Sequence, residues 1–220
     1  MLKAVIFDMD GVLVDTEPLY DQQRITYTKK RFNVDIDKEF MARARGLSSR
    51  SFFELLFAEF KITHSIGEVI THSRDDYFEF LKNHPDLKPI DGVVNLISKL
   101  HESGILLAVA SSASLRRINF MLDLLNVKDK FKAISHSDIV TKGKPHPDIY
   151  LKAAKLLNVR TDECLAIEDA TNGVKSAKSA GMKVIGYKGS SHNTRDLSDA
   201  DLIIKNFQEI DLLKLNNLFQ

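Results

Sequence analysis

The sequence predicts an α/β protein in which helices cover a parallel β-sheet and an all-helical segment is inserted into the chain. The first observation is a series of short, continuous apolar runs with helix-like patterns between them. The second is one long, phenylalanine-rich stretch in which those runs stop. With 220 residues, 44% of them hydrophobic, the chain can form one ordinary core and a smaller second one.

Six apolar runs are expected to form the strands of the sheet. Runs without polar alternation are typical of strands buried on both faces, as in parallel sheets. Their alternation with helical segments favours right-handed crossover connections between the strands. The runs lie at residues 4–7, 105–110, 133–135, 164–167, 183–187 and 202–204.

Three of the helices between these runs have recognisable ends. Two of them end at Gly104 and Gly181, because glycine readily adopts the backbone conformation that terminates a helix. A third, at residues 147–158, begins with Pro147, since the first helical turn does not need the backbone N–H that proline lacks. These signals predict the helices that return the chain from one strand to the next.

Residues 19–84 break the alternation of strands and helices. This stretch contains no proline, only two glycines, and eight of the thirteen phenylalanines of the chain. Because the phenylalanine spacing is helical, we expect three to five helices with a small core of their own. The expected domains are a main domain of residues 1–16 and 88–220 and a helical domain of residues 17–87.

The composition argues against several functional classes. The net charge is +1 and no basic block suggests a nucleic acid partner. The single cysteine, Cys164, cannot form an intrachain disulfide, which fits a reducing compartment. Because Asp8 and Asp10 interrupt the first apolar run, we do not expect it to be a signal peptide, and no run approaches the roughly 20 residues of a membrane helix. We expect a cytoplasmic monomer without a membrane or nucleic acid partner.

Polar side chains follow the first four strands of the predicted sheet. One such residue alone is more often a helix cap than a catalyst. In an open parallel sheet, however, ligands bind outside the carboxyl ends of the strands, so four such groups are expected to converge. The residues are Asp8 and Asp10, then Ser111 and Ser112, then Lys144, and finally Glu168 and Asp169.

A site with these residues needs a cation and suits a phosphate group. Two carboxylates about 4 Å apart repel each other by roughly 4 kcal/mol at an effective dielectric constant near 20. Without a nearby Cys or His pair, the oxygen ligands favour Mg²⁺ over zinc. Lys144 and the Ser111 hydroxyl supply the donors that an anion requires. We therefore expect these residues to form a site for a phosphate group.

The spacing of Asp8 and Asp10 suggests that both carboxylates react. On an extended chain, residues two apart project to the same side. One carboxylate can attack phosphorus and form an aspartyl phosphate, which divides a difficult displacement into two easier ones. The other can protonate the leaving oxygen and later activate water.

Four segments of the chain resemble the motifs of the haloacid dehalogenase-like superfamily. They are "FDMDGVLVDTEP", "ASSAS", "GKPHPD" and "IEDATNGVKSAKSAG", and the resemblance extends from Leu2 to about Tyr187. It is strongest to the subgroup of beta-phosphoglucomutases and small sugar-phosphate phosphatases. The resemblance implies a Rossmann-like catalytic core with a helical cap inserted after the first motif.

The resemblance also implies a role for each matching residue. Asp8 corresponds to the nucleophile and Asp10 to the general acid and base. The magnesium ligands correspond to the Asp8 and Asp169 carboxylates and the Asp10 carbonyl, and Glu168 acts on the metal through water. Ser111 and Lys144 correspond to the groups that hold the transferring phosphoryl.

Substrate contacts are expected from Arg50, Ser112 and Tyr20. In the cap, "GLSSR" resembles a loop that sets substrate specificity, and its Arg50 would meet the phosphate that is not transferred.

Three departures from the mutase pattern favour hydrolysis over isomerisation. The resemblance implies a histidine at the position of Tyr20 and a cap lysine near Ser73 and Arg74. It also implies a Lys-Asn pair where this chain has Ser114 and Leu115. We therefore expect a magnesium-dependent phosphatase for small phosphorylated metabolites, with sugar phosphates as the expected class, and a phosphohexomutase of the beta-phosphoglucomutase type as the alternative.

Two further classes fit the residues less well. A phosphorelay receiver domain also uses acids, a hydroxyl and a lysine, but its acceptor follows the third strand and it has no helical insert. A haloacid dehalogenase uses an aspartate nucleophile without a metal, which leaves Asp10 and the Glu168–Asp169 pair unexplained. The fold alone would not distinguish these classes.

Overall fold

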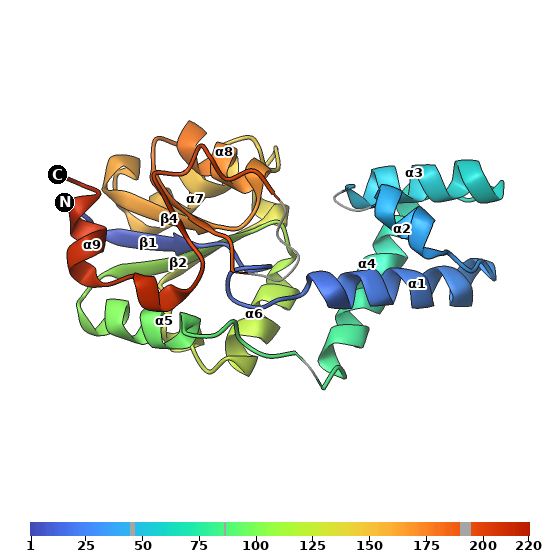
Figure 1. The fold of residues 1–220 in the computed structure, drawn as a ribbon, viewed down its shortest axis with the longest axis horizontal. Coiled ribbons are helices and arrows are strands. Elements are labelled where there is room, and N and C mark those ends of the chain that lie inside the picture. Colours follow the sequence, from blue (N-terminus) through green and yellow to red (C-terminus); the bar gives the residue numbers. More distant parts are fainter. Residues whose placement is uncertain (45–46, 86, 190–194) are drawn as a thin grey trace. The chain divides into compact units, whose positions relative to one another are not determined.

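The computed structural model describes residues 1–44, 47–85, 87–189 and 195–220. The chain divides into two compact units, which are coloured along the sequence in Figure 1. The sheet unit comprises Met1–Asp15 and Lys88–Gln220, and the helical unit comprises Thr16–Leu87. The predicted fold class, a Rossmann-like α/β core with an inserted helical segment, is confirmed.

The sheet unit contains a six-stranded parallel sheet with the order β3-β2-β1-β4-β5-β6. Strand β1 is entirely apolar, β4 is apolar up to its last residue, Glu168, and both strands are buried because helices cover both faces of the sheet. The strands are β1 (Ala4–Phe7), β2 (Leu106–Ser111), β3 (Ala133–His136), β4 (Cys164–Glu168), β5 (Lys183–Tyr187) and β6 (Leu202–Ile204).

The pairing register of the sheet aligns the carboxyl ends of its three central strands, β2, β1 and β4. Phe7 of β1 pairs with Val109 of β2 and with Ile167 of β4. The next residue, Asp8, donates its backbone N–H to the Ile167 carbonyl at 3.0 Å. Strand β2 continues to Ser111, so the residues that follow β1, β2 and β4 meet at one edge of the sheet.

Helices pack on both faces of this sheet, with α7 and α8 on one side and α5 on the other (Figure 1). Small residues on α7 and α8, such as Ala153 and Ala177, let these helices approach the strands closely. Gly104 and Gly181 have φ values of 76° and 80°, as expected for the residues that end α5 and α8. The helices are α5 (Val93–Glu102), α6 (Leu115–Leu124), α7 (Asp148–Leu157), α8 (Thr171–Ser179) and α9 (Leu212–Asn217).

The helical unit has its own core of aromatic side chains, as its composition predicts. Phe52 and Phe53 are buried and pack edge to face, with their ring centroids 5.1 Å apart. Phe40 and Leu56 belong to the same buried cluster. In its described residues the unit contains α1 (Glu17–Phe32), α2 (Lys38–Ala44), α3 (Ser49–Phe60) and α4 (Ile66–Lys82).

Serine caps fix the first turns of two helices in this unit. The Ser48 hydroxyl accepts the Ser51 N–H at the start of α3, and the Ser65 hydroxyl accepts the Glu68 N–H at the start of α4. The cap of α3 places Ser49 and Arg50 in its first turn. None of the helices in the described ranges has the length and hydrophobicity that crossing a membrane requires.

Candidate functional site

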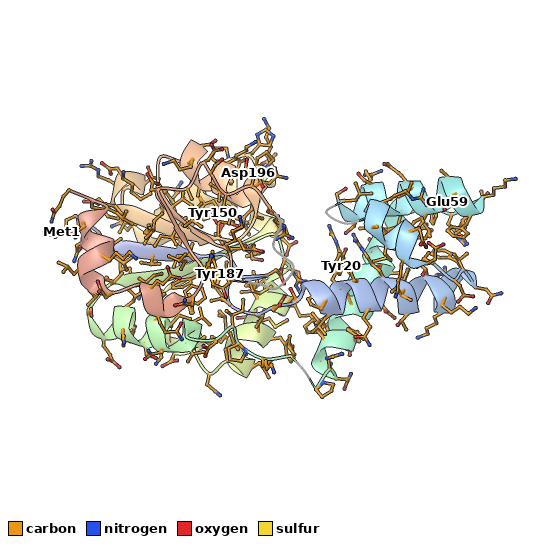
Figure 2. All side chains as sticks on the ribbon, in the orientation of Figure 1. Met1, Tyr20, Glu59, Tyr150, Tyr187 and Asp196 are labelled. Atoms are coloured by element: carbon orange, nitrogen blue, oxygen red, sulfur yellow. The ribbon has the colours of Figure 1, made fainter. Side chains whose placement is uncertain are left out.

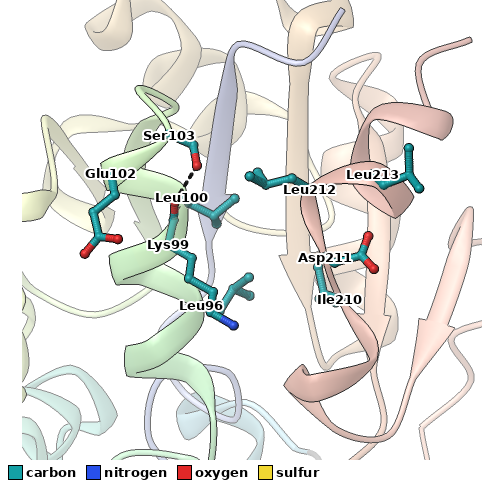
Figure 3. A pocket seen from close by; sticks show the side chains of 9 residues that line it. All are labelled: Leu96, Lys99, Leu100, Glu102, Ser103, Ile210, Asp211, Leu212 and Leu213. Atoms are coloured by element: carbon teal, nitrogen blue, oxygen red, sulfur yellow. Dashed lines mark hydrogen bonds between the residues drawn. The ribbon is translucent and has the colours of Figure 1, made fainter.

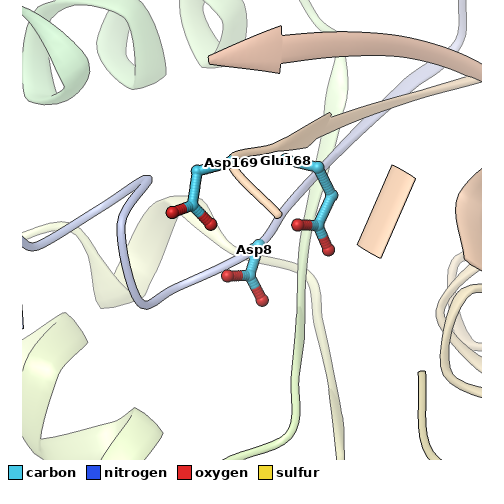
Figure 4. Close-up of side chains that lie close together, drawn as sticks. All are labelled: Asp8, Glu168 and Asp169. Carbon is cyan, nitrogen blue, oxygen red and sulfur yellow. The ribbon is translucent and has the colours of Figure 1, made fainter. Parts of the chain in front are cut away.

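Three buried carboxylates meet at the carboxyl edge of the sheet. Asp8 follows β1, Glu168 ends β4, and Asp169 is the next residue (Figure 4). One carboxylate oxygen from each residue lies within 4.8 Å of the other two, and the residues are only 7%, 1% and 2% exposed. At this separation the negative charges repel each other strongly, and burial removes the water that would screen them.

One ammonium group partly compensates this negative charge. The Lys144 Nζ donates to Asp8 Oδ1 at 2.7 Å and to Glu168 Oε1 at 2.5 Å. It also donates to the Ala110 carbonyl at 3.1 Å, at the end of β2. The ammonium therefore joins the ends of three neighbouring strands and compensates two of the three carboxylates, Asp8 and Glu168.

The pKa values of these groups follow from burial and from the neighbouring charges. Burial raises the pKa of Asp8 to about 7, with Lys144 opposing the rise and Glu168 and Asp10 adding to it. Burial likewise raises the pKa of Asp169 well above its usual range, against the effect of Arg195. Burial alone would lower the pKa of Lys144, but the nearby carboxylates raise it above its ordinary value.

The donor set of the cluster fits a hard divalent cation. The three described residues of the cluster, Asp8, Glu168 and Asp169, offer carboxylate oxygens as ligand atoms. Oxygen ligands suit hard cations such as Mg²⁺, whereas histidine and cysteine ligands suit zinc. A cation between them would relieve both the mutual repulsion and the desolvation that raise the carboxyl pKa values. The acidic cluster could therefore hold a metal ion.

Two glycines make room for the carboxylates. A Cβ atom at Gly173, in the first turn of α8, would lie 2.0 Å from the Glu168 carboxyl group. A Cβ atom at Gly11 would lie 2.2 Å from Asp169 Oδ2, and the φ of +84° at Gly11 also disfavours other residues. The positions of Glu168 and Asp169 thus depend on the absence of side chains at these two residues.

The sequence analysis missed three partners of the acids. The Tyr150 hydroxyl donates to Glu168 Oε1 at 2.6 Å, and Arg195 Nη1 donates to Asp169 Oδ2 at 2.6 Å. Arg117 forms an ion pair with Asp10 Oδ2. Only Tyr150 could have been found from the sequence. It lies on the apolar face of the helix after Lys144, and a tyrosine hydroxyl that is buried there needs a hydrogen-bond partner.

The structure brings some of the predicted residues of the sheet unit together more closely than others. Asp8, Lys144, Glu168 and Asp169 adjoin one another, whereas the Asp10 side chain is outside the group of three carboxylates and pairs with Arg117. The buried Ser111 Oγ accepts the Ala113 N–H at 3.1 Å, and Ser112 is exposed. The catalytic and substrate roles of these residues remain predictions.

Tyr20 and Arg50 belong to the helical unit. The Tyr20 hydroxyl and Ser49 Oγ form a hydrogen bond of 3.0 Å, and the Tyr20 ring packs against Tyr77 with centroids 4.9 Å apart. Arg50 is exposed and its Nη1 lies 3.7 Å from Glu54 Oε1. The substrate-binding role of both residues remains a prediction.

A hollow elsewhere on the sheet unit lies between α5 and the segment that leads into α9 (Figure 3). Its wall is mainly apolar and includes Leu96, Leu100 and Leu212. Ser103 lies on its rim shortly before β2 begins, so the hollow is toward the amino ends of the strands. It is therefore separate from the acidic cluster at the carboxyl ends.

A parallel sheet that gathers acids and one ammonium group at its carboxyl edge defines an α/β enzyme with an acidic centre. The family model described as haloacid dehalogenase-like hydrolase matches residues 5–187. The chain therefore belongs to this family of hydrolytic enzymes, which confirms the resemblance of its motifs.

The chain is similar over nearly its whole length to relatives with different names. It is 34% identical to the Beta-phosphoglucomutase of Bacillus subtilis, over 96% of this chain and 92% of the relative. It is 30% identical to the Phosphorylated carbohydrates phosphatase of Thermotoga maritima, over 97% and 99%. A solved structure of a HAD hydrolase, family IA, variant 3, from Entamoeba histolytica has a TM-score of 0.84 and 26% identity and covers 99% of both chains.

We predict that Gly173→Ala destabilises the protein because the new methyl group would overlap the Glu168 carboxyl group. Overpacking of this kind typically costs about 1–3 kcal/mol, and differential scanning calorimetry should show a lower Tm. Gly67→Ala is the control, since a Cβ there meets nothing within 4 Å and its helix should be slightly stabilised. Equal Tm values for Gly173→Ala and the unmodified protein would contradict the close approach.

Proposed function

We propose that the protein is a magnesium-dependent phosphatase that releases phosphate from small phosphorylated metabolites, with sugar phosphates as the substrate class. The observation that carries this proposal is the meeting of three buried carboxylates with one buried ammonium at the carboxyl edge of the sheet. Acids around a cation, beside an amine that can face an anion, suit phosphoryl transfer. The similarity to a relative named as a phosphatase of phosphorylated carbohydrates supports the substrate class.

The acids serve as metal ligands, and Asp8 and Asp10 also take part in the reaction. Asp8, Asp169 and the Asp10 carbonyl would hold Mg²⁺, and Glu168 would act through a bound water. The ion would neutralise negative charge that builds on the phosphoryl oxygens in the transition state. Lys144 and Ser111 orient those oxygens, and within the described residues the Ser111 hydroxyl hydrogen has no acceptor and can be donated to an anion.

The reaction proceeds in two displacements at phosphorus. A carboxylate oxygen of Asp8 attacks phosphorus, the bond to the sugar oxygen breaks, and Asp10 donates its proton to that leaving oxygen. Water then attacks the phosphorus of the aspartyl phosphate while Asp10 accepts a proton from the water. Phosphate departs, and the Asp8 carboxylate and protonated Asp10 are restored.

Isomerisation is the second candidate function, because a relative at 34% identity is named Beta-phosphoglucomutase. In that reaction the aspartyl phosphate passes to a second hydroxyl instead of to water. The hydrogen bond between Tyr20 and Ser49 favours hydrolysis, since this phenol is engaged within the helical unit. A tyrosine hydroxyl can donate a hydrogen bond, but the side chain lacks the imidazole that suits proton transfer near neutral pH.

We predict that Asp8→Asn abolishes phosphate release and preserves the fold. An amide nitrogen is not a nucleophile, but its side chain has the same size and its oxygen can still accept from Lys144. Asp10→Asn should reduce kcat by about 10²–10⁴-fold, because protonation of the leaving oxygen is lost. Steady-state assays check both variants, with Asp123→Asn as a control at an exposed carboxylate. Normal turnover by Asp8→Asn would disprove the covalent route.

We predict that phosphate release requires Mg²⁺. Activity should disappear after treatment with EDTA and dialysis, return with Mg²⁺, and return poorly with Ca²⁺, which prefers more oxygen ligands at longer distances. A malachite green assay on the metal-free and reconstituted protein measures this dependence. Full activity of the metal-free protein would exclude the metal assignment.

We predict that hydrolysis outpaces isomerisation. The protein is incubated with beta-glucose 1-phosphate and a trace of glucose 1,6-bisphosphate, and NMR follows glucose 6-phosphate and free phosphate together. Phosphate should form faster, because water competes for the aspartyl phosphate. If glucose 6-phosphate forms much faster than phosphate, the protein is a mutase.

A further inference from the structure

The two basic side chains that compensate the acidic cluster differ in how easily they can leave it. The Lys144 ammonium bonds two carboxylates and a backbone carbonyl, and its side chain is 11% exposed. Arg195 Nη1 donates to Asp169 Oδ2 at 2.6 Å, and the Arg195 side chain is 34% exposed. A buried ammonium with three acceptors loses much when it moves, whereas water can replace the carboxylate around a half-exposed guanidinium. Arg195 is therefore the charge that can leave the cluster.

The backbone that carries Arg195 is fixed beside the cluster. The carbonyl of the next residue, Asp196 (Figure 2), accepts the Thr171 hydroxyl at 2.7 Å, and Thr171 follows Asp169 by two residues. Leu197 is buried and belongs to the core of the sheet unit. The ion pair can therefore open through a movement of the Arg195 side chain, while its backbone stays in place.

The Asp169 carboxylate, in contrast, has little room to move. Its side chain is only 4% exposed, and one of its oxygens is held by Arg195. A Cβ atom at Gly11 would lie 2.2 Å from Asp169 Oδ2 and 3.0 Å from Oδ1, so the backbone at Gly11 encloses the carboxylate closely on that side. A carboxylate that cannot turn away keeps its charge at the cluster, and any second counter-charge must share it with the guanidinium.

The charge of the cluster depends on whether Arg195 is present. Asp8, Glu168 and Asp169 carry three negative charges when they are ionised, and Lys144 and Arg195 bring two positive charges. Without Arg195, three negative charges and one positive charge remain, and this excess of two matches a divalent cation. A guanidinium that stays beside Asp169 repels such a cation, because burial keeps water from screening the two like charges.

We propose that Arg195 competes with Mg²⁺ for Asp169 and thereby sets the metal affinity of the acidic cluster. By thermodynamic linkage, the ion weakens the pair between Arg195 and Asp169 as much as the pair weakens binding of the ion. The inference rests on the magnesium assignment of the proposed function. Arg195 lies beyond residues 5–187, which the family model matches, so family membership alone does not predict this role. Arg195 takes no part in the reaction at phosphorus.

Calorimetric titration of the metal-free chain with Mg²⁺ tests the competition, in mildly alkaline buffer so that protons compete little for the carboxylates. The Kd should fall about 10-fold in Arg195→Gln, which removes the charge and keeps an N–H donor. Arg195→Lys keeps the charge and should bind Mg²⁺ like the unmodified protein. Arg160→Gln, at an exposed arginine paired with Asp162, is the control and should leave the Kd unchanged. An unchanged or higher Kd in Arg195→Gln would overturn the proposal, since the guanidinium would then orient Asp169 for the ion.

NMR of the unmodified protein tests the opening of the ion pair and is independent of turnover. Rotation about the Nε–Cζ bond of Arg195 is slowed while Asp169 holds Nη1, so saturating Mg²⁺ should speed this rotation. The Arg195 resonances are assigned by their absence from the spectrum of Arg195→Lys. Unchanged rotation, or no Mg²⁺ binding by either the unmodified protein or Arg195→Gln, would overturn the proposal. Faster rotation and the lower Kd of Arg195→Gln in a protein that releases no phosphate would sustain the competition and reject the phosphatase.

Discussion

The candidate site depends on the hydrogen bonds of the Lys144 ammonium group. This group lies between Asp8 and Glu168 and also reaches the carbonyl at the end of β2. Without this charge, the repulsion between Asp8 and Glu168 would lose its main compensation. Arg195 pairs with Asp169, so Lys144 and Arg195 together bring two positive charges to three carboxylates. A net negative charge is left, which explains why the cluster suits a cation.

The parallel sheet makes this arrangement possible. Because Phe7 pairs with both Val109 and Ile167, the chain leaves β1, β2 and β4 at the same level. Residues that are far apart in sequence then become neighbours. Gly11 and Gly173 complete the arrangement, since side chains there would occupy the space of Asp169 and Glu168.

The helical unit has a different physical character. Its core is aromatic, and its polar groups surround a guanidinium that is stacked between Tyr20 and Phe52. Family membership places the chain among the haloacid dehalogenase-like hydrolases. The reaction at phosphorus that we propose uses side chains of the sheet unit alone.

The sequence by itself determined the strands, the helical insert and the acids at the strand ends. Continuous apolar runs require burial on both faces, and the topology of a parallel sheet then places Asp8, Lys144 and Glu168 together. Only the tertiary structure decided that Tyr150 bonds Glu168, that Arg117 pairs with Asp10 and that Arg195 pairs with Asp169. These relations depend on how side chains from separate helices and loops pack, and no local periodicity encodes such packing.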